Sequence, residues 1–192
     1  MTTSGRKVSL TGIKPTGEPH IGNYIGAIKP ALELAEQYEA MYFIADYHAL
    51  TTVRDPELLR HYSRSVAATW IAAGLDPERI TMYLQSDVPE TFELTWILSC
   101  VTAKGMMNRA HAYKAARDRN AESGKDDLDA GINMGTYNYP VLMAADILLM
   151  DSDSPARSTT SSAAASPSSR SPRSSSPRPT PARPCRAPTA AR

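Results

Sequence analysis

The segment 154–192 constrains the fold of this chain more than any other feature, because it contains no residue that can build a hydrophobic core. Its 39 residues are Ser, Pro, Ala, Arg, Thr and one Cys, without any aliphatic residue larger than alanine and without any aromatic residue. Such a segment cannot offset the entropy lost on ordering by burying apolar surface. The sequence therefore predicts one folded domain over 1–153 and a disordered Ser/Pro/Arg-rich tail over 154–192.

Charge divides the chain at the same place. The formal net charge is +1, but the tail carries seven arginines and no acidic residue, so the rest of the chain is net acidic. An acidic domain does not coat nucleic acid over its whole surface, although it can carry a local basic patch. Cys100, Cys185 and the four histidines show no zinc-ligand spacing, and no apolar run is long enough to cross a membrane. We expect a cytoplasmic protein with no metal site of its own and no membrane-spanning or exported segment.

Short apolar runs alternate with helical periods in the first half of the chain. Residues 7–13, 41–46 and 80–86 are apolar and bounded by turn residues, as buried strands are. Residues 21–35 and 56–73 repeat apolar side chains at helical spacing, and Asp55 before Pro56 is a typical helix start. This alternation predicts an α/β fold with a parallel sheet and flanking helices.

The rest of the domain is predicted to be helical, over 89–101, 106–119 and 139–150, with a polar loop that is mobile or lies over a site. A right-handed crossover should deliver the chain from the last helix to a fourth strand. The Ser/Pro/Arg-rich segment begins there instead. The sequence therefore predicts an incomplete sheet of three strands.

The stretch GIKPTGEPHIGNYIGA, residues 12–27, lies between the first strand and the first helix. Ligands of open parallel sheets bind at this edge, outside the carboxyl ends of the strands. His20 and Asn23 fall in the first helical turn, where side-chain donors and free backbone N–H groups suit phosphate oxygens, and Gly22 lets a ligand approach the backbone. An ordinary capped helix entry after a glycine-rich loop explains the same spacing equally well.

The same stretch resembles the "HIGH" signature of the class I aminoacyl-tRNA synthetases, written here as HIGN, and its GxxPxGxxHxGNY form looks like the tryptophanyl members. The resemblance implies a Rossmann-like (HUP-type) fold and ATP as a substrate, with Mg²⁺ bound only through ATP. It also implies that His20 and Asn23 act at the ATP phosphates as catalytic residues. The nucleotide-binding residues implied are Gly12, Lys14, Gly22, Asn23 and Lys114.

A second polar group, in ADYHALT, follows the second predicted strand. Asp46 and His48 lie at its carboxyl end, on the same sheet edge as the HIGN turn if the sheet is parallel. From the residues alone, His48 either binds a substrate or is a structural histidine bonded to Asp46 or to backbone. The family resemblance continues through this segment and implies that His48 lines the amino-acid pocket.

The third group lies in YPVLMAADILLM, where Tyr139, Met143 and Asp146 share one face of a helix. One carboxylate on an otherwise apolar helix is costly to bury without a partner, and such an acceptor suits an indole N–H. Asp146 could instead face solvent or cap a neighbouring element. The resemblance implies that Asp146 recognises the indole of L-tryptophan, that Met143 packs beside it, and that Tyr139 meets the polar end of the amino acid.

The tyrosyl synthetases are the alternative within this superfamily. Their matching helix carries a YxxxQxxD pattern, whereas Met143 takes the place of the glutamine here. Tryptophan is therefore favoured over tyrosine as the substrate.

The resemblance covers residues 8–153 and then stops. The family would continue with a Val-Pro-Val-Gly strand, a lysine-rich KMSKS loop that stabilises departing pyrophosphate, and an anticodon-binding domain, yet residues 154–192 contain no lysine. A tail of this composition is typical of GC-rich coding sequence read in a wrong frame, which suggests a frameshift near residue 153. A genuine basic tail is the alternative.

Residues 1–153 are thus interpreted as a partial nucleotide-binding catalytic domain of a tryptophan–tRNA ligase, with L-tryptophan, ATP and tRNA(Trp) as substrates and a homodimer as the expected assembly. A non-catalytic module that binds nucleotide or tryptophan, or that pairs with a complete synthetase, is the alternative. An RNA-binding protein with a basic tail is a third interpretation, and it rests on the seven arginines alone.

Overall fold

The structure is a computed structural model that describes residues 7–155. These residues lie within the first of two units, Met1–Ser161. The predicted disorder of the tail, and Cys185 within it, fall outside the described residues except at positions 154 and 155.

The centre of the described unit is a parallel sheet in the order β3-β2-β1-β4. Its strands are β1 (Val8–Ile13), β2 (Glu39–Ile44), β3 (Thr81–Leu84) and β4 (Ser154–Pro155). The predicted parallel α/β fold is confirmed, but the predicted number of strands is wrong. The chain reaches a fourth position in the sheet, where Ser154 and Pro155 pair with Ser9 and Leu10.

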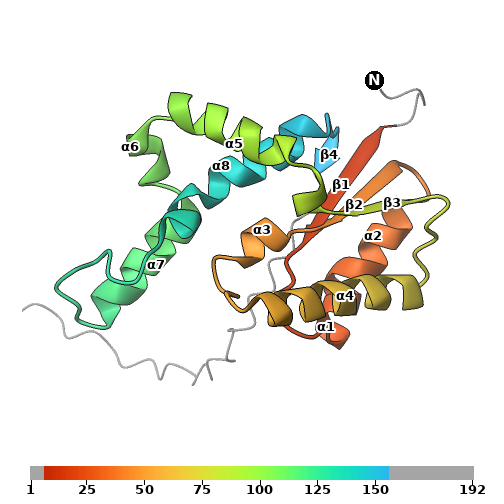
Figure 1. Ribbon diagram of the computed structural model, residues 1–192, viewed down its shortest axis with the longest axis horizontal. Coiled ribbons are helices and arrows are strands. Elements are labelled where there is room, and N and C mark those ends of the chain that lie inside the picture. The colour runs from red at the N-terminus through yellow and green to blue at the C-terminus, as the bar shows by residue number, and fades with distance from the viewer. Residues whose placement is uncertain (1–6, 156–192) are drawn as a thin grey trace, which may run out of the picture. The chain divides into compact units, whose positions relative to one another are not determined.

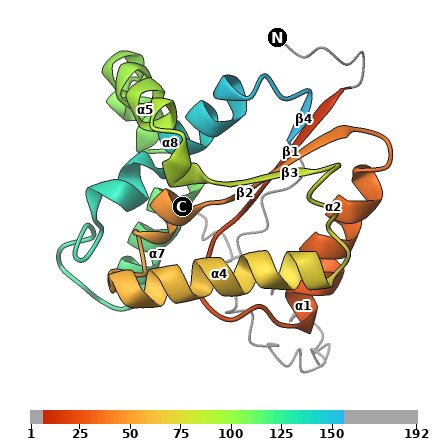
Figure 2. The same ribbon diagram turned by 45° about the vertical axis from the view of Figure 1, so that its right-hand side comes forward.

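Helices cover both faces of this sheet, as Figures 1 and 2 show. On one face, Tyr42 and Ile44 of β2 pack with α2 (Lys29–Leu34) and α4 (Pro56–Ala72), where Trp70 is almost fully buried. On the other face, Phe43 packs with Leu10 and with side chains near the end of α8 (Met134–Leu149). Successive strand residues point to opposite faces, so β2 contributes to both layers.

The first helix after β1 is not uniform. The predicted helix over 21–35 consists of α1 (Ile21–Asn23), a π-helical turn η1 (Tyr24–Ile28) and α2. Single π-helical turns are rare in proteins, and those that occur are often found at functional sites. This one directly follows the HIGN turn.

The later helices also differ from the prediction. Helix α5 (Glu90–Val101) has its expected position, but the predicted helix over 106–119 is split into α6 (Lys104–Met107) and α7 (His111–Glu122). Helix α8 begins five residues before the predicted start, because the side chain of Asn133 caps it by accepting a hydrogen bond from the backbone N–H of Thr136. Two short helices, α3 (Asp46–Ala49) and the 3-10 turn η2 (Gln85–Asp87), follow β2 and β3.

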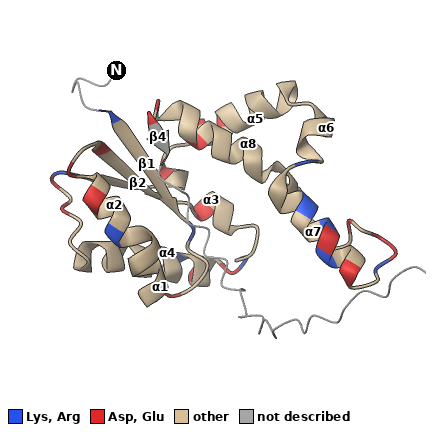
Figure 3. Ribbon diagram, turned by 180° about the vertical axis from the view of Figure 1, so that it is seen from behind, with Lys and Arg blue, Asp and Glu red and all other residues tan. Residues whose placement is uncertain are grey.

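The polar loop after α7 is tied to that helix. The side-chain amide of Asn120 donates to the carbonyls of Leu128 and Ala130, and Lys125 donates to the Asn120 side-chain oxygen. Figure 3 shows how charged residues gather on α7 and on this loop. The contacts therefore hold the loop against α7. No helix within residues 7–155 is long and apolar enough to cross a membrane.

Candidate functional site

The polar residues that follow β2 and β3 are joined at the carboxyl edge of the sheet. Asp46, the first residue of α3, accepts hydrogen bonds through Oδ1 from the backbone N–H groups of Tyr47, at 3.0 Å, and Ser86, at 3.1 Å. The Asp46 side chain thus links the end of β2 to the turn after β3. It does not bind His48, so the predicted alternative of an Asp46–His48 pair is not what the structure contains.

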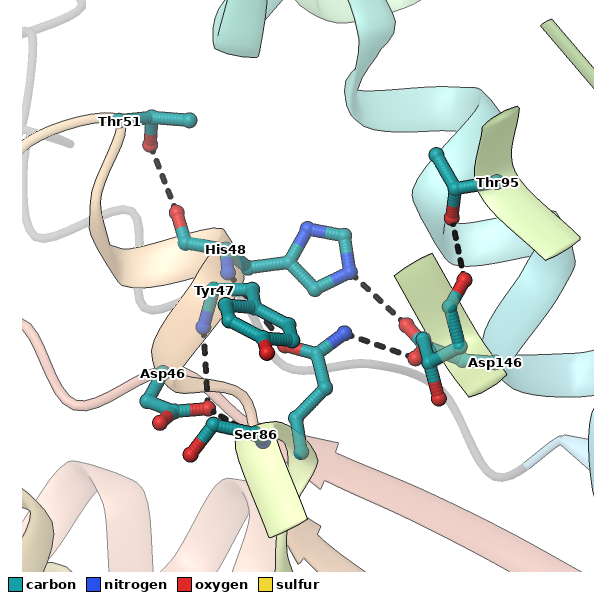
Figure 4. A network of polar contacts seen from close by, with 9 residues as sticks. Asp46, Tyr47, His48, Thr51, Ser86, Thr95 and Asp146 are labelled. Carbon is teal, nitrogen blue, oxygen red and sulfur yellow. Dashed lines mark hydrogen bonds and ion pairs between the residues drawn. The ribbon is translucent and has the colours of Figure 1, made fainter. Parts of the chain in front are cut away.

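A buried hydrogen-bond network crosses from this edge to α8. Nε2 of His48 lies 2.9 Å from Oδ2 of Asp146, and Nε2 of Gln85 donates to Oδ1 of Asp146 at 2.7 Å. Figure 4 shows the imidazole of His48 facing the Asp146 carboxylate. A carboxylate only accepts hydrogen bonds, so the Nε2 nitrogen carries the proton in the bond from His48.

The burial of this network explains why both bonds are needed. The exposed fractions are 4% for His48, 5% for Asp146 and 1% for Gln85. A carboxylate removed from water is stable only where charged or hydrogen-bonding groups replace its hydration. Asp146 therefore neither faces solvent nor caps a helix, which removes that alternative from the sequence-based interpretation.

Two tyrosines lie close to this carboxylate. The pKa of Tyr83 and the pKa of Tyr139 are both raised, first by burial and then by the negative charge of Asp146. Both phenols thus keep their protons at neutral pH and can act as hydrogen-bond donors.

Tyr139 packs against the His48 ring, and Lys14 lies beside Tyr139. The Tyr139 ring lies 4.2 Å from the His48 ring, centroid to centroid, and Nζ of Lys14 lies 5.7 Å from the Tyr139 centroid. Lys14 also donates to Oγ1 of Thr51 at 2.8 Å, and burial lowers the pKa of its amine. Lys14 was predicted with the nucleotide residues, but its contacts join it to those predicted for the amino acid. Nδ1 of His48 is buried without a hydrogen-bond partner among residues 7–155.

The HIGN turn forms a reciprocal cap on α1. Nδ1 of His20 accepts from the backbone N–H of Gly22 at 3.1 Å, while Oδ1 of Asn23 accepts from the backbone N–H of His20 at 2.9 Å. The turn is exposed, and no residue in the described range bonds Nε2 of His20 or Nδ2 of Asn23. The capped helix entry and a set of free donors are therefore both present.

The two glycines predicted for nucleotide binding have packing roles in the structure. A Cβ on Gly22 would lie 2.9 Å from Cε1 of His20, and a Cβ on Gly12 would lie 2.4 Å from the Phe43 ring. The lack of a side chain at Gly22 thus leaves room for His20, and the lack of one at Gly12 leaves room for Phe43. Gly12 is the last residue but one of β1, close to the edge where the turn begins.

Two predicted residues do not join these groups. Met143 is 38% exposed on α8, between Tyr139 and Asp146. Lys114 is exposed on α7 and lines a cavity of about 520 Å³ with Asn108, Arg109, Arg117, Asp118, Ala121 and Leu128. That lining contains no other residue predicted for the site.

Two polar contacts involve residues that the sequence does not predict. Gln85 directly follows β3 at the carboxyl edge of the sheet, and a single polar residue at that place gives only a weak signal in the sequence. Glu18, in the HIGN loop, binds Nε2 of His61 at 2.5 Å and accepts from Oγ of Ser65, so the loop is anchored to α4. His61 and Ser65 are single polar positions on α4, and nothing in the sequence points to their contact with Glu18.

A cavity of about 710 Å³ lies beside His48, between α3, α5 and the start of α8. Aromatic side chains on its wall include Tyr47, Phe92 and Trp96, and Trp96 is 72% exposed. No cluster of three or more His, Cys, Asp or Glu side chains suited to a metal ion occurs between residues 7 and 155.

Comparison with known proteins gives consistent matches. The family model described as tRNA synthetases class I (W and Y) matches residues 3–157. A tryptophan–tRNA ligase from Neisseria meningitidis is 55% identical over 148 residues, which cover 76% of this chain and 44% of that protein. A tryptophan–tRNA ligase from Pseudomonas aeruginosa is 59% identical over 144 residues, covering 74% of this chain and 32% of that protein.

Among solved structures, the tryptophanyl-tRNA synthetase of Campylobacter jejuni in complex with ADP and tryptophan aligns with a TM-score of 0.65 and 46% identity. The alignment covers 76% of this chain and 43% of that one. The chain therefore spans less than half the length of each of these relatives.

Proposed function

Because this chain belongs to the class I tRNA synthetases of the tryptophan and tyrosine type, we propose that it is the amino-acid-activating part of a tryptophan–tRNA ligase. In the proposed reaction the carboxylate of L-tryptophan attacks the α-phosphorus of ATP, pyrophosphate leaves, and the tryptophanyl group passes from the adenylate to tRNA(Trp). The observation that carries the proposal is the 55% and 59% identity to proteins named tryptophan–tRNA ligase. The family model matches residues 3–157, which contain both the HIGN turn and the Asp146 network.

In this proposal the amino acid binds at α8. Asp146 accepts the indole N–H, Met143 packs against the ring, and Tyr139 with His48 meets the polar end of the amino acid. The support is chemical: Asp146 is a buried acceptor with fixed oxygens, and the Tyr139 ring packs at a tilt of 49° against His48, beside the Lys14 ammonium. A methionine in place of the glutamine of the tyrosyl pattern favours an apolar ring over a phenol.

The nucleotide binds at the HIGN turn in this proposal. Nε2 of His20 and Nδ2 of Asn23 donate to phosphate oxygens, beside the positive end of the helix dipole. Gly12, Gly22 and Lys14 belong to the same subsite, and Lys114 approaches ATP from α7. Mg²⁺ arrives with the triphosphate.

A homodimer and a cytoplasmic location complete the proposal. Helix α5 exposes Phe92, Trp96, Ile97 and Val101, an apolar surface that a second copy of the chain would cover. The same surface favours the second candidate function, in which the chain binds tryptophan or pairs with another synthetase chain without catalysis.

Tryptophan binding and tryptophan-dependent exchange of pyrophosphate into ATP separate these functions. The purified chain should bind L-tryptophan more tightly than L-tyrosine, as measured by calorimetry. Exchange activity that Asp146→Asn abolishes would support the ligase proposal. Tryptophan binding without exchange would support the non-catalytic candidate. No binding of tryptophan would contradict the ligase proposal and leave only pairing with another synthetase chain.

A further inference from the structure

We propose that Gln85 is a positioning residue for substrate selection: its side-chain amide fixes the Asp146 carboxylate so that the remaining lone pairs accept an N–H donor from the ligand in set directions. This role rests on the proposed function, because it assigns Asp146 to ligand recognition. Gln85 itself contacts Asp146 and α3, and it acts on the ligand only through Asp146.

The contacts of Gln85 make it a bridge between three elements. It begins the η2 turn after β3, donates through Nε2 to Oδ1 of Asp146 at 2.7 Å, and accepts through Oε1 from the backbone N–H of His48 at 3.4 Å. One amide thus joins the sheet edge, α3 and α8. It is 1% exposed, so solvent cannot replace either bond.

The chemistry of this position requires an amide. A glutamate would place a second negative charge against Asp146, and a methionine of similar length would offer no donor. With Nε2 of His48 on Oδ2 and Nε2 of Gln85 on Oδ1, each carboxylate oxygen already has one donor of the protein. About two of its roughly four lone-pair sites remain, and their directions are fixed by the two existing bonds.

Fixing an acceptor in this way gives specificity for a donor. A ligand that brings an N–H to Asp146 completes the network, whereas a ligand of the same shape without that proton leaves a buried carboxylate less well satisfied. Without Gln85, the carboxylate is held by His48 alone and can rotate. We expect the discrimination between the two ligands to fall, and not only the stability of the fold.

The test compares Gln85→Met with Gln37→Met in the full chain. Gln37 is exposed and is the only other glutamine, so the two variants share one chemical change. Calorimetry gives the affinity for L-tryptophan and for 3-(benzothiophen-3-yl)-L-alanine, in which a sulfur without a proton replaces the ring N–H at nearly the same shape. We expect Gln85→Met to weaken tryptophan binding by about tenfold to a hundredfold, the size of one hydrogen bond to a charged group, with less than about threefold effect on the sulfur analogue. Gln37→Met should change neither affinity.

Equal losses for both ligands, or no loss for either, would overturn the positioning role. If the unmodified chain does not bind tryptophan, the proposed function fails first, and the role of Gln85 in selection fails with it.

A second measurement needs no variant at position 85, in case Gln85→Met does not fold. With nitrogen-15 placed only in glutamine side chains, which removes the asparagine amides from the spectrum, the chain gives two side-chain amide signals, and Gln37→Met assigns them. Saturation with L-tryptophan should shift the Gln85 amide signals, because the partner carboxylate gains a new donor, and should leave those of Gln37 in place. If bound tryptophan leaves the Gln85 signals unchanged, the proposal is wrong.

Discussion

The HIGN turn and the Asp146 network are both polar, yet they are built in opposite ways. His20 and Asn23 bond each other across three residues at an exposed helix start, whereas His48 and Gln85 reach Asp146 across 98 and 61 positions in the chain. The turn forms wherever α1 forms. The network exists only when β2, β3 and α8 have all assembled, so its bonds depend on the tertiary fold and stabilise it in return.

The largest effect should come from Asp146→Ala. This change leaves the donors of His48 and Gln85 buried without an acceptor, at a cost of about 3–5 kcal/mol in the free energy of unfolding. Urea titration followed by circular dichroism measures this cost. Asp118→Ala, at an exposed aspartate on α7, should stay within about 0.5 kcal/mol. Similar losses in the two variants would mean that the buried network adds no more to the free energy of unfolding than an exposed aspartate does.

Gly12→Ala tests the close packing of β1 against Phe43 of β2 near the carboxyl edge of the sheet. The new Cβ would meet the Phe43 ring at 2.4 Å, and overpacking of this kind costs about 1–3 kcal/mol. Gly17→Ala is the matched control, because no heavy atom lies within 4 Å of a Cβ there. The same urea titration compares them. A Gly12→Ala protein as stable as Gly17→Ala would contradict close packing at this site.

A smaller loss is expected for His20→Ala. The change removes one cap of α1, and such caps contribute about 1 kcal/mol. His111→Ala is the control, since His111 begins α7 but makes no side-chain cap there. Thermal unfolding should separate the two variants by a few degrees. Equal melting temperatures would show that the His20 cap adds no stability.

Glu18 should give the smallest effect, one that depends on pH. Its pKa is lowered from an ordinary value of 4.5, first by the hydrogen bond from Ser65 and then by that from His61. A lowered pKa in the fold means that the contribution is present above pH 4.5 and is lost as the pH falls through the folded value.

The difference in melting temperature between the unmodified chain and Glu18→Gln should therefore shrink on acidification below pH 4.5. Glu78→Gln, at an exposed glutamate after α4, is the matched control for the change of charge. If the difference in melting temperature for Glu18→Gln stays constant with pH, the loop before the HIGN turn is not anchored to α4 through this carboxylate.

The same contrast explains how much of the fold is predictable from the sequence. Strands β1 and β2 lie where apolar runs end in turn residues, because burial on both faces leaves a local signature. Strand β3 is an edge strand with no fully buried residue, and its mostly apolar run still predicts it. Strand β4 has no such signature: Ser154 and Pro155 belong to a segment without Val, Ile, Leu, Met or aromatic residues, and only their pairing with β1 defines them as a strand. The start of α8 at Met134 depends on one side-chain cap at Asn133, which an apolar period does not show.

Prediction of the site divides along similar lines. The residues His20, Gly22 and Asn23 form one local motif, and the structure confirms that they lie together. The meeting of His48 with Asp146 follows from no spacing within the sequence, and neither does the contact between Lys14 and Tyr139. Gln85 is missed because a single polar residue after a strand becomes informative only when its partner on α8 is known.

The reciprocal cap of the HIGN turn has a thermodynamic consequence for any ligand that meets it. His20 and Asn23 are already held by backbone N–H groups before a ligand arrives, so their rotamers are fixed in the free protein. Ordering a flexible side chain on association typically costs about 0.5–1.5 kcal/mol. A phosphate group that bonds Nε2 of His20 and Nδ2 of Asn23 therefore meets donors whose conformational entropy was already lost when the helix formed.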